Sequence, residues 1–366
     1  MKTEEIRNLE SVPSPALLVF PGRVGANIQR MIDTVDGQVA RLRPHVKTHK
    51  MAEVVRMQVD AGITRFKCAT ISEAEMTAES GGRDILLAHQ PVGPNIRRYL
   101  HLQACFPMVS FNTIVDSPQI VAKLEETGRH ARLYVDIDCG MHRTGIEPGV
   151  AALKLCRMIA KSSTLEFAGL HVYDGHIHDE DPEERAESHA RSIETWAEML
   201  ETLEKEGPKP PEIVAGGSPT FALSAGREGW QCSPGTTLFW DAGYDTLHSD
   251  LGFEVAAMLL TRVISLPGEG RICLDLGHKS VAAENPLEKR VQFPALPEAR
   301  AVLHSEEHLV LEIPGNHGLS PGDEVLGIPW HICPTVALHD KAHVVQDGEV
   351  TGESWQIQAR NRYLTI

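Results

Sequence analysis

The sequence predicts an α/β protein: a (β/α)8 barrel of the TIM type followed by a C-terminal β-domain. Two observations predict this class. Short apolar or β-branched runs alternate eight times with amphipathic stretches over roughly 200 residues, which is the pattern of a parallel (β/α)8 barrel. After Asp245 the helical periodicity gives way to short strands between turns rich in proline, glycine and aspartate. With 366 residues, the chain can form one large α/β domain and a smaller second one.

The predicted barrel strands are apolar and β-branched runs, at 37–47, 64–70, 84–90, 107–112, 131–138, 165–173, 211–217 and 235–240. Helices are predicted at 71–82 and 185–207, because apolar positions recur there at three- and four-residue spacing. The predicted strands of the β-domain are 256–266, 271–277, 308–314 and 335–340. The resulting domains are 15–245 and 246–366, with 1–14 as a candidate addition to the second. The run 14–20 either completes the β-domain or starts the barrel.

Composition limits the class of partner. Hydrophobic residues make up 42% of the chain, and 50 acidic against 35 basic side chains leave a net charge of −15. This balance argues against nucleic acid or an anionic membrane as the main partner. No apolar run approaches the length of a membrane span, and the N-terminal residues are polar where a signal peptide would be apolar, so a cytoplasmic location is expected. Seven cysteines without a CxxC pair fit reduced thiols.

The segment RPHVKTHK, Arg43–Lys50, ends the first predicted strand with two lysines and two histidines. In a parallel barrel the catalytic residues lie at the C-terminal ends of the strands. Strand alternation puts Arg43, His45 and Lys47 on one face, so Lys47 is expected to enter the mouth of the barrel. A desolvated lysine is a nucleophile toward a carbonyl group. The alternative is that Lys47 and Lys50 lie on a solvated turn, as most lysines do.

Two other strand ends carry candidate site residues. In VDIDCGMHRTGI, 135–146, Arg143 offers a guanidinium that suits a negative oxygen, and a structural salt bridge is the alternative. In GLHVYDGHIH, 169–178, Tyr173 is by its position a strand residue with its hydroxyl at the rim. His176 and His178 either ligate a metal or begin an acidic, solvated loop.

A phosphate site is predicted at VAGGSPTF, 214–221. Gly217 lets backbone N–H groups approach a phosphate, and the hydroxyls of Ser218 and Thr220 add donors. An ordinary strand-to-helix loop is the alternative. The penultimate strand is, however, where barrels commonly bind phosphate.

A metal pair is predicted at WHICPTVALHD, 330–340. His331 and Cys333 are two residues apart, so on a strand both side chains would face the same way and hold one ion. A thiolate favours a borderline or soft ion, which puts zinc before manganese or cobalt and magnesium last. The alternative is a buried structural thiol at Cys333.

Together and in this order, the segments from about Pro15 onward resemble the fold-type III, alanine racemase-like pyridoxal-phosphate enzymes. RPHVKTHK and the His-x-Cys-Pro-Thr segment resemble the metal-dependent D-threonine aldolase and D-serine dehydratase group. The resemblance implies that Lys47 forms the Schiff base, with Lys50 as the reserve candidate. The implied cofactor contacts come from Arg143, Tyr173, Gly217, Ser218, Thr220, Gly235 and Thr236. It also implies a homodimer.

The function implied by the resemblance is that of a lyase that depends on pyridoxal phosphate and a divalent metal and acts on D-3-hydroxyamino acids. Aldolase cleavage to glycine and an aldehyde is expected first. A D-serine or D-3-hydroxyaspartate dehydratase, which gives a keto acid and ammonia, is the alternative, and Cys333 matches the dehydratases better than the aldolases, which tend to carry aspartate there. An amino-acid racemase is a more distant alternative that would leave the metal pair unexplained.

Overall fold

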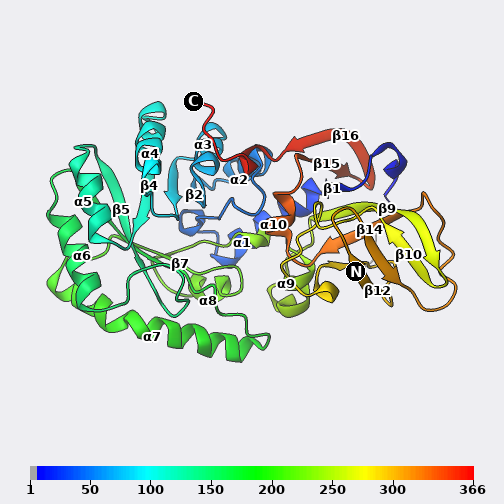
Figure 1. Cartoon of the computed structure of the whole chain (residues 1–366). Coiled ribbons are helices and arrows are strands. Elements are labelled where there is room, and N and C mark those ends of the chain that lie inside the picture. The colour runs from blue at the N-terminus through cyan, green and yellow to red at the C-terminus, as the bar shows by residue number, and fades with distance from the viewer. Residues whose placement is uncertain (1–5) are drawn as a thin grey trace. The chain divides into compact units, whose positions relative to one another are not determined.

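A computed structural model describes residues 6–366, which divide into two compact units (Figure 1). The barrel unit comprises residues 29–47, 53–235 and 361–366. The sheet unit comprises residues 6–28, 48–52 and 236–360. Among the residues described, no helix is long and apolar enough to cross a membrane.

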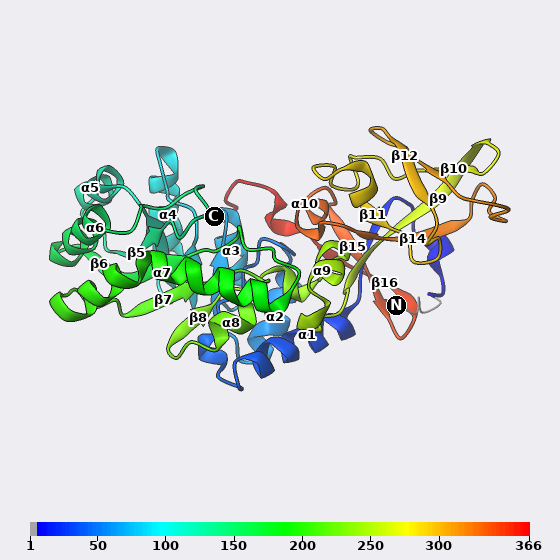
Figure 2. The ribbon, with the colours of Figure 1, turned by 90° about the horizontal axis from the view of Figure 1, so that it is seen from below.

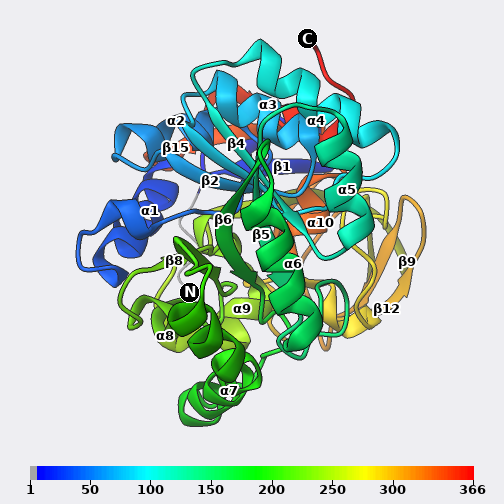
Figure 3. The ribbon, with the colours of Figure 1, turned by 90° about the vertical axis from the view of Figure 1, so that its left-hand side faces the viewer.

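Seven parallel strands form the sheet of the barrel unit, each paired with the next in sequence (Figure 3). They are β2 (Arg65–Cys68), β3 (Asp84–Leu87), β4 (Ser110–Val115), β5 (Ala131–Ile137), β6 (Leu165–Val172), β7 (Glu212–Ala215) and β8 (Trp230–Cys232). The segment 42–46 takes the remaining place, because Leu42 bridges to Cys232 of β8 and His45 bridges to Lys67 of β2. These bridges close the ring and confirm the predicted (β/α)8 fold.

The closing segment is less regular than the predicted strand 37–47. Gly37 has a φ of 75° and makes a turn, and the 3-10 helix η2 (Val39–Arg41) follows it. Hydrogen bonds to both neighbours begin at Arg43, whose N–H donates to the Cys232 carbonyl at 2.8 Å. The N–H of Val46 donates to the Lys67 carbonyl at 2.9 Å. The prediction was therefore right about the closing residues and wrong about the start of the strand.

The last predicted strand, 235–240, was placed too late in the chain. These residues contain the 3-10 helix η3 (Thr236–Leu238), and β8 lies before them. Ser233, Pro234 and Gly235 separate the two elements. Because proline has no N–H to continue a strand ladder, the strand ends there, although the β-branched Thr236 and Thr237 favour a strand locally.

Helices cover the outside of the parallel sheet (Figure 3). They are α2 (Ala52–Asp60), α3 (Ile71–Glu79), α4 (Pro94–Cys105), α5 (Pro118–Glu126), α6 (Val150–Lys161), α7 (Pro182–Glu206) and α8 (Phe221–Ala225). The helices predicted at 71–82 and 185–207 are confirmed as α3 and the long α7 (Figure 2). The Asp181 side chain caps α7 by accepting from the N–H groups of Glu183 and Glu184. Helix α1 (Pro21–Thr34) starts in the sheet unit and ends in the barrel unit.

A network of charged side chains fills the N-terminal end of the barrel. Arg43 is fully buried, and its guanidinium donates to Asp84 at 2.8 Å and to Gln231 at 2.6 Å. Glu212 accepts from Arg65 at 3.1 Å and also from the Tyr134 hydroxyl. Burial alone would raise the pKa of Asp84, but the Arg43 charge holds it below its usual value. Above this network, the apolar layer of the barrel consists of Leu86, Ile114, Tyr134, Ala168 and Val214.

The sheet unit contains nine strands. They are β1 (Ala16–Val19), β9 (Ala257–Gly268), β10 (Arg271–Leu274), β11 (Val291–Gln292), β12 (Arg300–His304), β13 (Leu309–Glu312), β14 (Glu324–Pro329), β15 (Lys341–Gln346) and β16 (Glu349–Gln356). Strand β1 pairs with β9 and β15, so the run 14–20 completes the sheet rather than starting the barrel (Figure 1). The two compact units therefore have different residue ranges from the predicted domains 15–245 and 246–366. Strands predicted at 256–266, 271–277 and 308–314 are confirmed as β9, β10 and β13.

The strand predicted at 335–340 is wrong, because residues 332–336 form the short helix α10 (Ile332–Val336). Its first turn is held by Asp241, whose carboxylate accepts from the Ile332 N–H at 3.0 Å, and Pro334 is tolerated there because early helical N–H groups need no partner within the helix. The remaining short helices of the sheet unit are η1 (Leu9–Ser11), α9 (Ala242–Leu247), η4 (Ser249–Leu251), η5 (Leu287–Lys289) and η6 (Gln358–Arg360).

Candidate active site

The histidines of the segment RPHVKTHK support its backbone. The Nδ1 atom of His45 accepts from the Lys47 N–H at 3.3 Å, and Nδ1 of His49 accepts from the Met51 N–H at 3.1 Å. Each ring therefore binds the amide two residues later and fixes a turn. Burial lowers the pKa of His49 to about 3, which keeps its ring neutral and able to accept. These residues hold the backbone on either side of Lys47 in one conformation.

Three cations of the barrel unit surround one aromatic ring. The Lys47 Nζ atom lies 5.6 Å from the centroid of the Tyr173 ring, and the Arg143 guanidinium carbon lies 5.0 Å from it. The Lys67 Nζ atom lies 5.4 Å from the same centroid. Lys47 and Tyr173 are half-buried and Arg143 is exposed. The structure thus brings together three predicted site residues from distant segments, at the C-terminal end of the strands.

Two glycines allow the Tyr173 ring to take its position. A Cβ atom on Gly175 would lie 2.3 Å from an atom of the ring, and one on Gly217 would lie 3.2 Å from the ring. A side chain at Gly175 would therefore displace the ring. Gly217 belongs to the predicted phosphate loop, so this loop lies directly against Tyr173.

The phosphate loop is held by hydrogen bonds from neighbouring elements. The Gly217 N–H donates to Asp174 Oδ1 at 3.1 Å, and Asp174 Oδ2 lies 3.0 Å from His189 Nδ1. Ser218 Oγ accepts from the Gly235 N–H at 3.2 Å, which joins the loops that follow β7 and β8. Asp174 and His189 are both buried, so this support is shielded from water.

The same region contains buried hydroxyl groups that fit a phosphate. The Oγ atoms of Ser224 and Ser233 are buried and have no hydrogen-bond partner in the described part of the chain. Thr220 is also buried, and a Cβ on Gly216 would lie 2.8 Å from Ser224 Oγ and 3.2 Å from Thr220 Oγ1. Buried hydroxyls normally have partners, so these two groups remain available as donors to an acceptor-rich ligand. The donors present fit the phosphate of the predicted cofactor.

In the sheet unit, His331 and Cys333 lie at the start of α10 rather than on the predicted strand. His331 has extended backbone geometry and precedes the helix, while Cys333 lies in its first turn. His331 Nδ1 lies 2.6 Å from Glu284 Oε1. Cys333 Sγ lies 3.1 Å from the Thr48 hydroxyl and 3.5 Å from the Thr236 hydroxyl.

The electrostatics of this pair fit a cation. Burial lowers the pKa of His331, but the hydrogen bond to Cys333 and the nearby carboxylates outweigh it and raise the pKa to about 9. Burial raises the pKa of Asp241 to about 6. Imidazole and thiol suit zinc and other borderline ions, so the donors present fit the predicted metal. Between residues 6 and 366 no group of three or more His, Cys, Asp or Glu side chains is arranged to hold a metal ion, so the structure adds no third residue to the predicted pair.

Other predicted site residues lie elsewhere. Lys50, the reserve lysine, belongs to the sheet unit, and its carbonyl accepts from the Ala359 N–H at 3.2 Å. The Thr236 hydroxyl faces Cys333. His176 and His178 are both exposed, in agreement with a solvated loop.

Three polar residues of the barrel interior were not predicted. Lys67 of β2 is 2% exposed, and Asp136 of β5 and His171 of β6 are buried and joined by a contact of 2.6 Å between Oδ1 and Nδ1. The one signal for Lys67 is a lysine in the middle of the apolar strand RFKC. The sequence predicts that run, 64–70, only as a strand.

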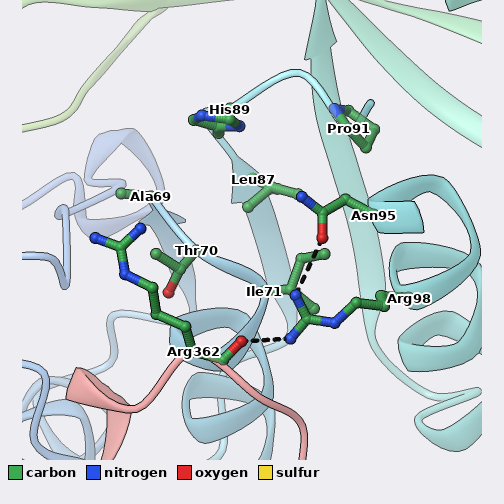
Figure 4. Close-up of a pocket in the computed structure, with 9 residues that line it drawn as sticks. All are labelled: Ala69, Thr70, Ile71, Leu87, His89, Pro91, Asn95, Arg98 and Arg362. Carbon is green, nitrogen blue, oxygen red and sulfur yellow. Dashed lines mark hydrogen bonds between the residues drawn. The ribbon is translucent and has the colours of Figure 1, made fainter. Parts of the chain in front are cut away.

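A small cavity of about 160 Å³ lies beyond the ends of β2 and β3 (Figure 4). Ala69 and Thr70, which follow β2, line it together with Leu87 and Arg98. The Arg98 guanidinium donates to Asn95 Oδ1 at 3.0 Å and to the Arg362 carbonyl at 2.7 Å, so the C-terminal residues form one of its walls.

The closed parallel barrel, with a lysine and a phosphate-type loop at the carboxyl ends of its strands and a separate β-sheet unit, defines the class as the alanine racemase-like (β/α)8 enzymes. The alanine racemase N-terminal domain model matches residues 21–242, and the chain belongs to this family. Residues 256–345 match the model of a putative serine dehydratase domain. The family predicted from the sequence is confirmed.

Known proteins resemble the chain over nearly its whole length. D-threonine aldolase from an Arthrobacter species is 29% identical over 96% of this chain and 94% of its own. The crystal structure of D-threonine aldolase from Filomicrobium marinum has a TM-score of 0.88 and 28% identity over 96% of this chain and 97% of that one. D-threo-3-hydroxyaspartate dehydratase from Delftia sp. HT23 has a TM-score of 0.81 and 25% identity over 95% and 98%. These are lyases, in agreement with the predicted enzyme class.

Proposed function

We propose that the chain is a pyridoxal-phosphate-dependent lyase that cleaves D-3-hydroxyamino acids to glycine and an aldehyde. The observation that carries this proposal is the convergence of Lys47 and Arg143 on the Tyr173 ring, against the glycine of the phosphate loop. The relatives named as aldolases support the direction of the reaction.

The residues of the barrel unit have separate roles in this proposal. Lys47 presents a half-buried amine for the aldehyde carbon of the cofactor, and Arg143 offers its guanidinium to an anionic ring oxygen. Tyr173 provides a flat apolar surface beside both cations. When bound, pyridoxal phosphate supplies an electron sink for the bond broken at the α-carbon of the substrate.

The phosphate group would be held by the loops after β7 and β8. Ser218 and Thr220 would supply hydroxyl groups, while Gly217 and Gly235 would line the phosphate site, their N–H groups fixing the two loops by donating to Asp174 and to Ser218 Oγ. Thr236 is also proposed to contact the phosphate group, through its backbone, because its hydroxyl lies toward Cys333.

A divalent metal would be held by His331 and Cys333, with zinc preferred over manganese or cobalt, and magnesium last. Glu284 contacts Nδ1 of His331, which leaves Nε2 as the donor for an ion. The ion would act as a Lewis acid on the substrate hydroxyl.

The choice of reaction is tested by the products. Incubating the loaded enzyme with D-threonine, D-serine and D-3-hydroxyaspartate should release glycine and the matching aldehyde. A keto acid with ammonia would instead establish the dehydratase, the second candidate, which Cys333 and the Delftia relative favour. Formation of the L-amino acid alone would indicate a racemase and would contradict the proposed lyase.

Assembly and location remain predictions. A homodimer is expected from the family resemblance, and sedimentation equilibrium of the loaded protein tests it. The predicted cytoplasmic location fits the seven cysteines, none of which forms a disulfide bond in the described residues.

A further inference from the structure

Lys67 carries a buried amine that has no ion-pair partner among the described residues. Its residue is 2% exposed, and its Nζ atom lies 5.4 Å from the centroid of the Tyr173 ring. Within residues 6–366, no carboxylate lies within 4.0 Å of this atom. Lysines this deeply buried are rare unless they are paired.

Two carboxylates, those of Asp174 and Asp136, raise the pKa of Lys67, and both already contact other groups. Asp136 contacts His171 at 2.6 Å, and Asp174 accepts from Gly217 while it contacts His189. Neither aspartate is therefore available as a close counter-ion. The Nε2 atom of His171 is also buried and lacks a partner in the described residues.

The other groups that face Lys67 add positive charge or none. Arg43 and Lys47 come from the closing segment, together with His45, which bridges to Lys67. Tyr173 presents its ring, and Arg143 approaches that ring from the loop after β5. Strand β3 contributes the apolar Leu86 opposite Lys67. The surroundings of Lys67 thus contain more cations than free anions.

Such a site costs free energy unless the amine loses its proton or gains an anion. Burial, and next the charge of Lys47, lower the pKa of Lys67 to about 7, so near neutral pH the amine can switch between the two forms. An anionic oxygen at hydrogen-bond distance would stabilise the charged form. The geometry therefore creates a binding site for an anion beside Tyr173.

We propose that Lys67, together with Arg143, binds an anionic oxygen held against the Tyr173 ring, and that Lys67 is a binding residue of the active site. This inference rests on the proposed function, since pyridoxal phosphate and its amino-acid substrate are the anions concerned. Two sources share the chemistry: an oxyanion of the cofactor and a carboxylate of the substrate.

The test compares wild type with Lys67→Met, which keeps the length of the side chain and removes its charge, and with Lys67→Gln, which keeps it polar. Lys123→Met, at an exposed position of α5, is the matched control. The dissociation constant of pyridoxal phosphate is measured on the apoprotein of each variant. The dissociation constant of D-threonine is then measured on the loaded protein from the change in cofactor absorbance.

If the oxygen belongs to the cofactor, Lys67→Met and Lys67→Gln bind pyridoxal phosphate about 10- to 100-fold more weakly than wild type. If it belongs to the substrate, cofactor affinity is retained and D-threonine binds more weakly by the same factor. Values within about twofold of wild type for both ligands would overturn the proposal. A wild-type protein that fails to bind pyridoxal phosphate would overturn the proposed function itself, which is a different result.

Discussion

The two ends of the barrel differ in whether their buried basic side chains are in ion pairs. At the N-terminal end, Arg43 is paired with Asp84 at 2.8 Å and hydrogen-bonded to Gln231. At the C-terminal end, Lys67 has no ion pair with any residue from 6 to 366, and Lys47 lies 5.6 Å from the Tyr173 ring centroid. The paired end holds the ring of strands closed. The unpaired end has an excess of positive charge, which an anionic ligand can neutralise. Such an excess on a rigid scaffold favours ligand binding.

The largest expected effect is on the unpaired end. Lys47→Ala should prevent covalent attachment of pyridoxal phosphate and lower turnover by ~10³-fold or more, because the proposed nucleophile is gone. Borohydride treatment followed by peptide mapping locates the attached cofactor, and circular dichroism checks the fold. Lys50→Ala is the matched control and should retain attachment. Attachment that persists in Lys47→Ala and disappears in Lys50→Ala would transfer the role to Lys50.

The sheet unit provides the second prediction, because its proposed function is separable from cofactor binding. His331→Ala, Cys333→Ala and exhaustive chelation should each lower turnover by ~100-fold or more, since the Lewis acid is lost. The absorbance of the bound cofactor should change little. Metal analysis of each protein gives an independent readout. Full activity of metal-free protein would rule out the proposed pair.

The third prediction concerns the paired end. Arg43→Met should destabilise the fold by roughly 3–5 kcal/mol, because Asp84 and Glu212 are then left without their buried partner. Urea unfolding monitored by fluorescence measures the loss. Adding Asp84→Asn to Arg43→Met should restore part of the stability, as the uncompensated charge is removed. A double variant no more stable than Arg43→Met would argue against a charge effect.

The smallest expected effect is a gain in the free energy of unfolding rather than a loss. Lys67→Met should stabilise the apoprotein by ~2 kcal/mol at pH 7, because folding no longer buries an unpaired amine. The pKa of Lys67 falls from 10.5 to about 7 on folding, so between these values the unfolded chain holds a proton that the folded chain lacks. The stability of the wild type therefore rises with pH across this window, and the gain from Lys67→Met shrinks toward pH 10.5. Equal unfolding midpoints of the two proteins at pH 7 would contradict this account.

Local patterns were enough to predict most of the fold. The alternation of strands and helices, the helix periodicity at 185–207 and the change after Asp245 led to the correct architecture. Errors fell where local preference and the final structure disagree. Thr236 and Thr237 favour a strand but follow Pro234, and the run 335–340 is β-branched at its start although Asp241 caps a helix there.

The sequence by itself determined the fold class, because periodicity depends on neighbours in the chain, and the resemblance of its motifs to a known family implied Lys47, Arg143 and Tyr173 as site residues. Only the tertiary structure decided which cations are paired. Arg43 meets Asp84 and Lys67 meets Tyr173 through the closing of the barrel, and these partners are far apart in sequence. The free energy of a buried charge depends on every group around it, and that environment exists only once the strands have closed into a ring.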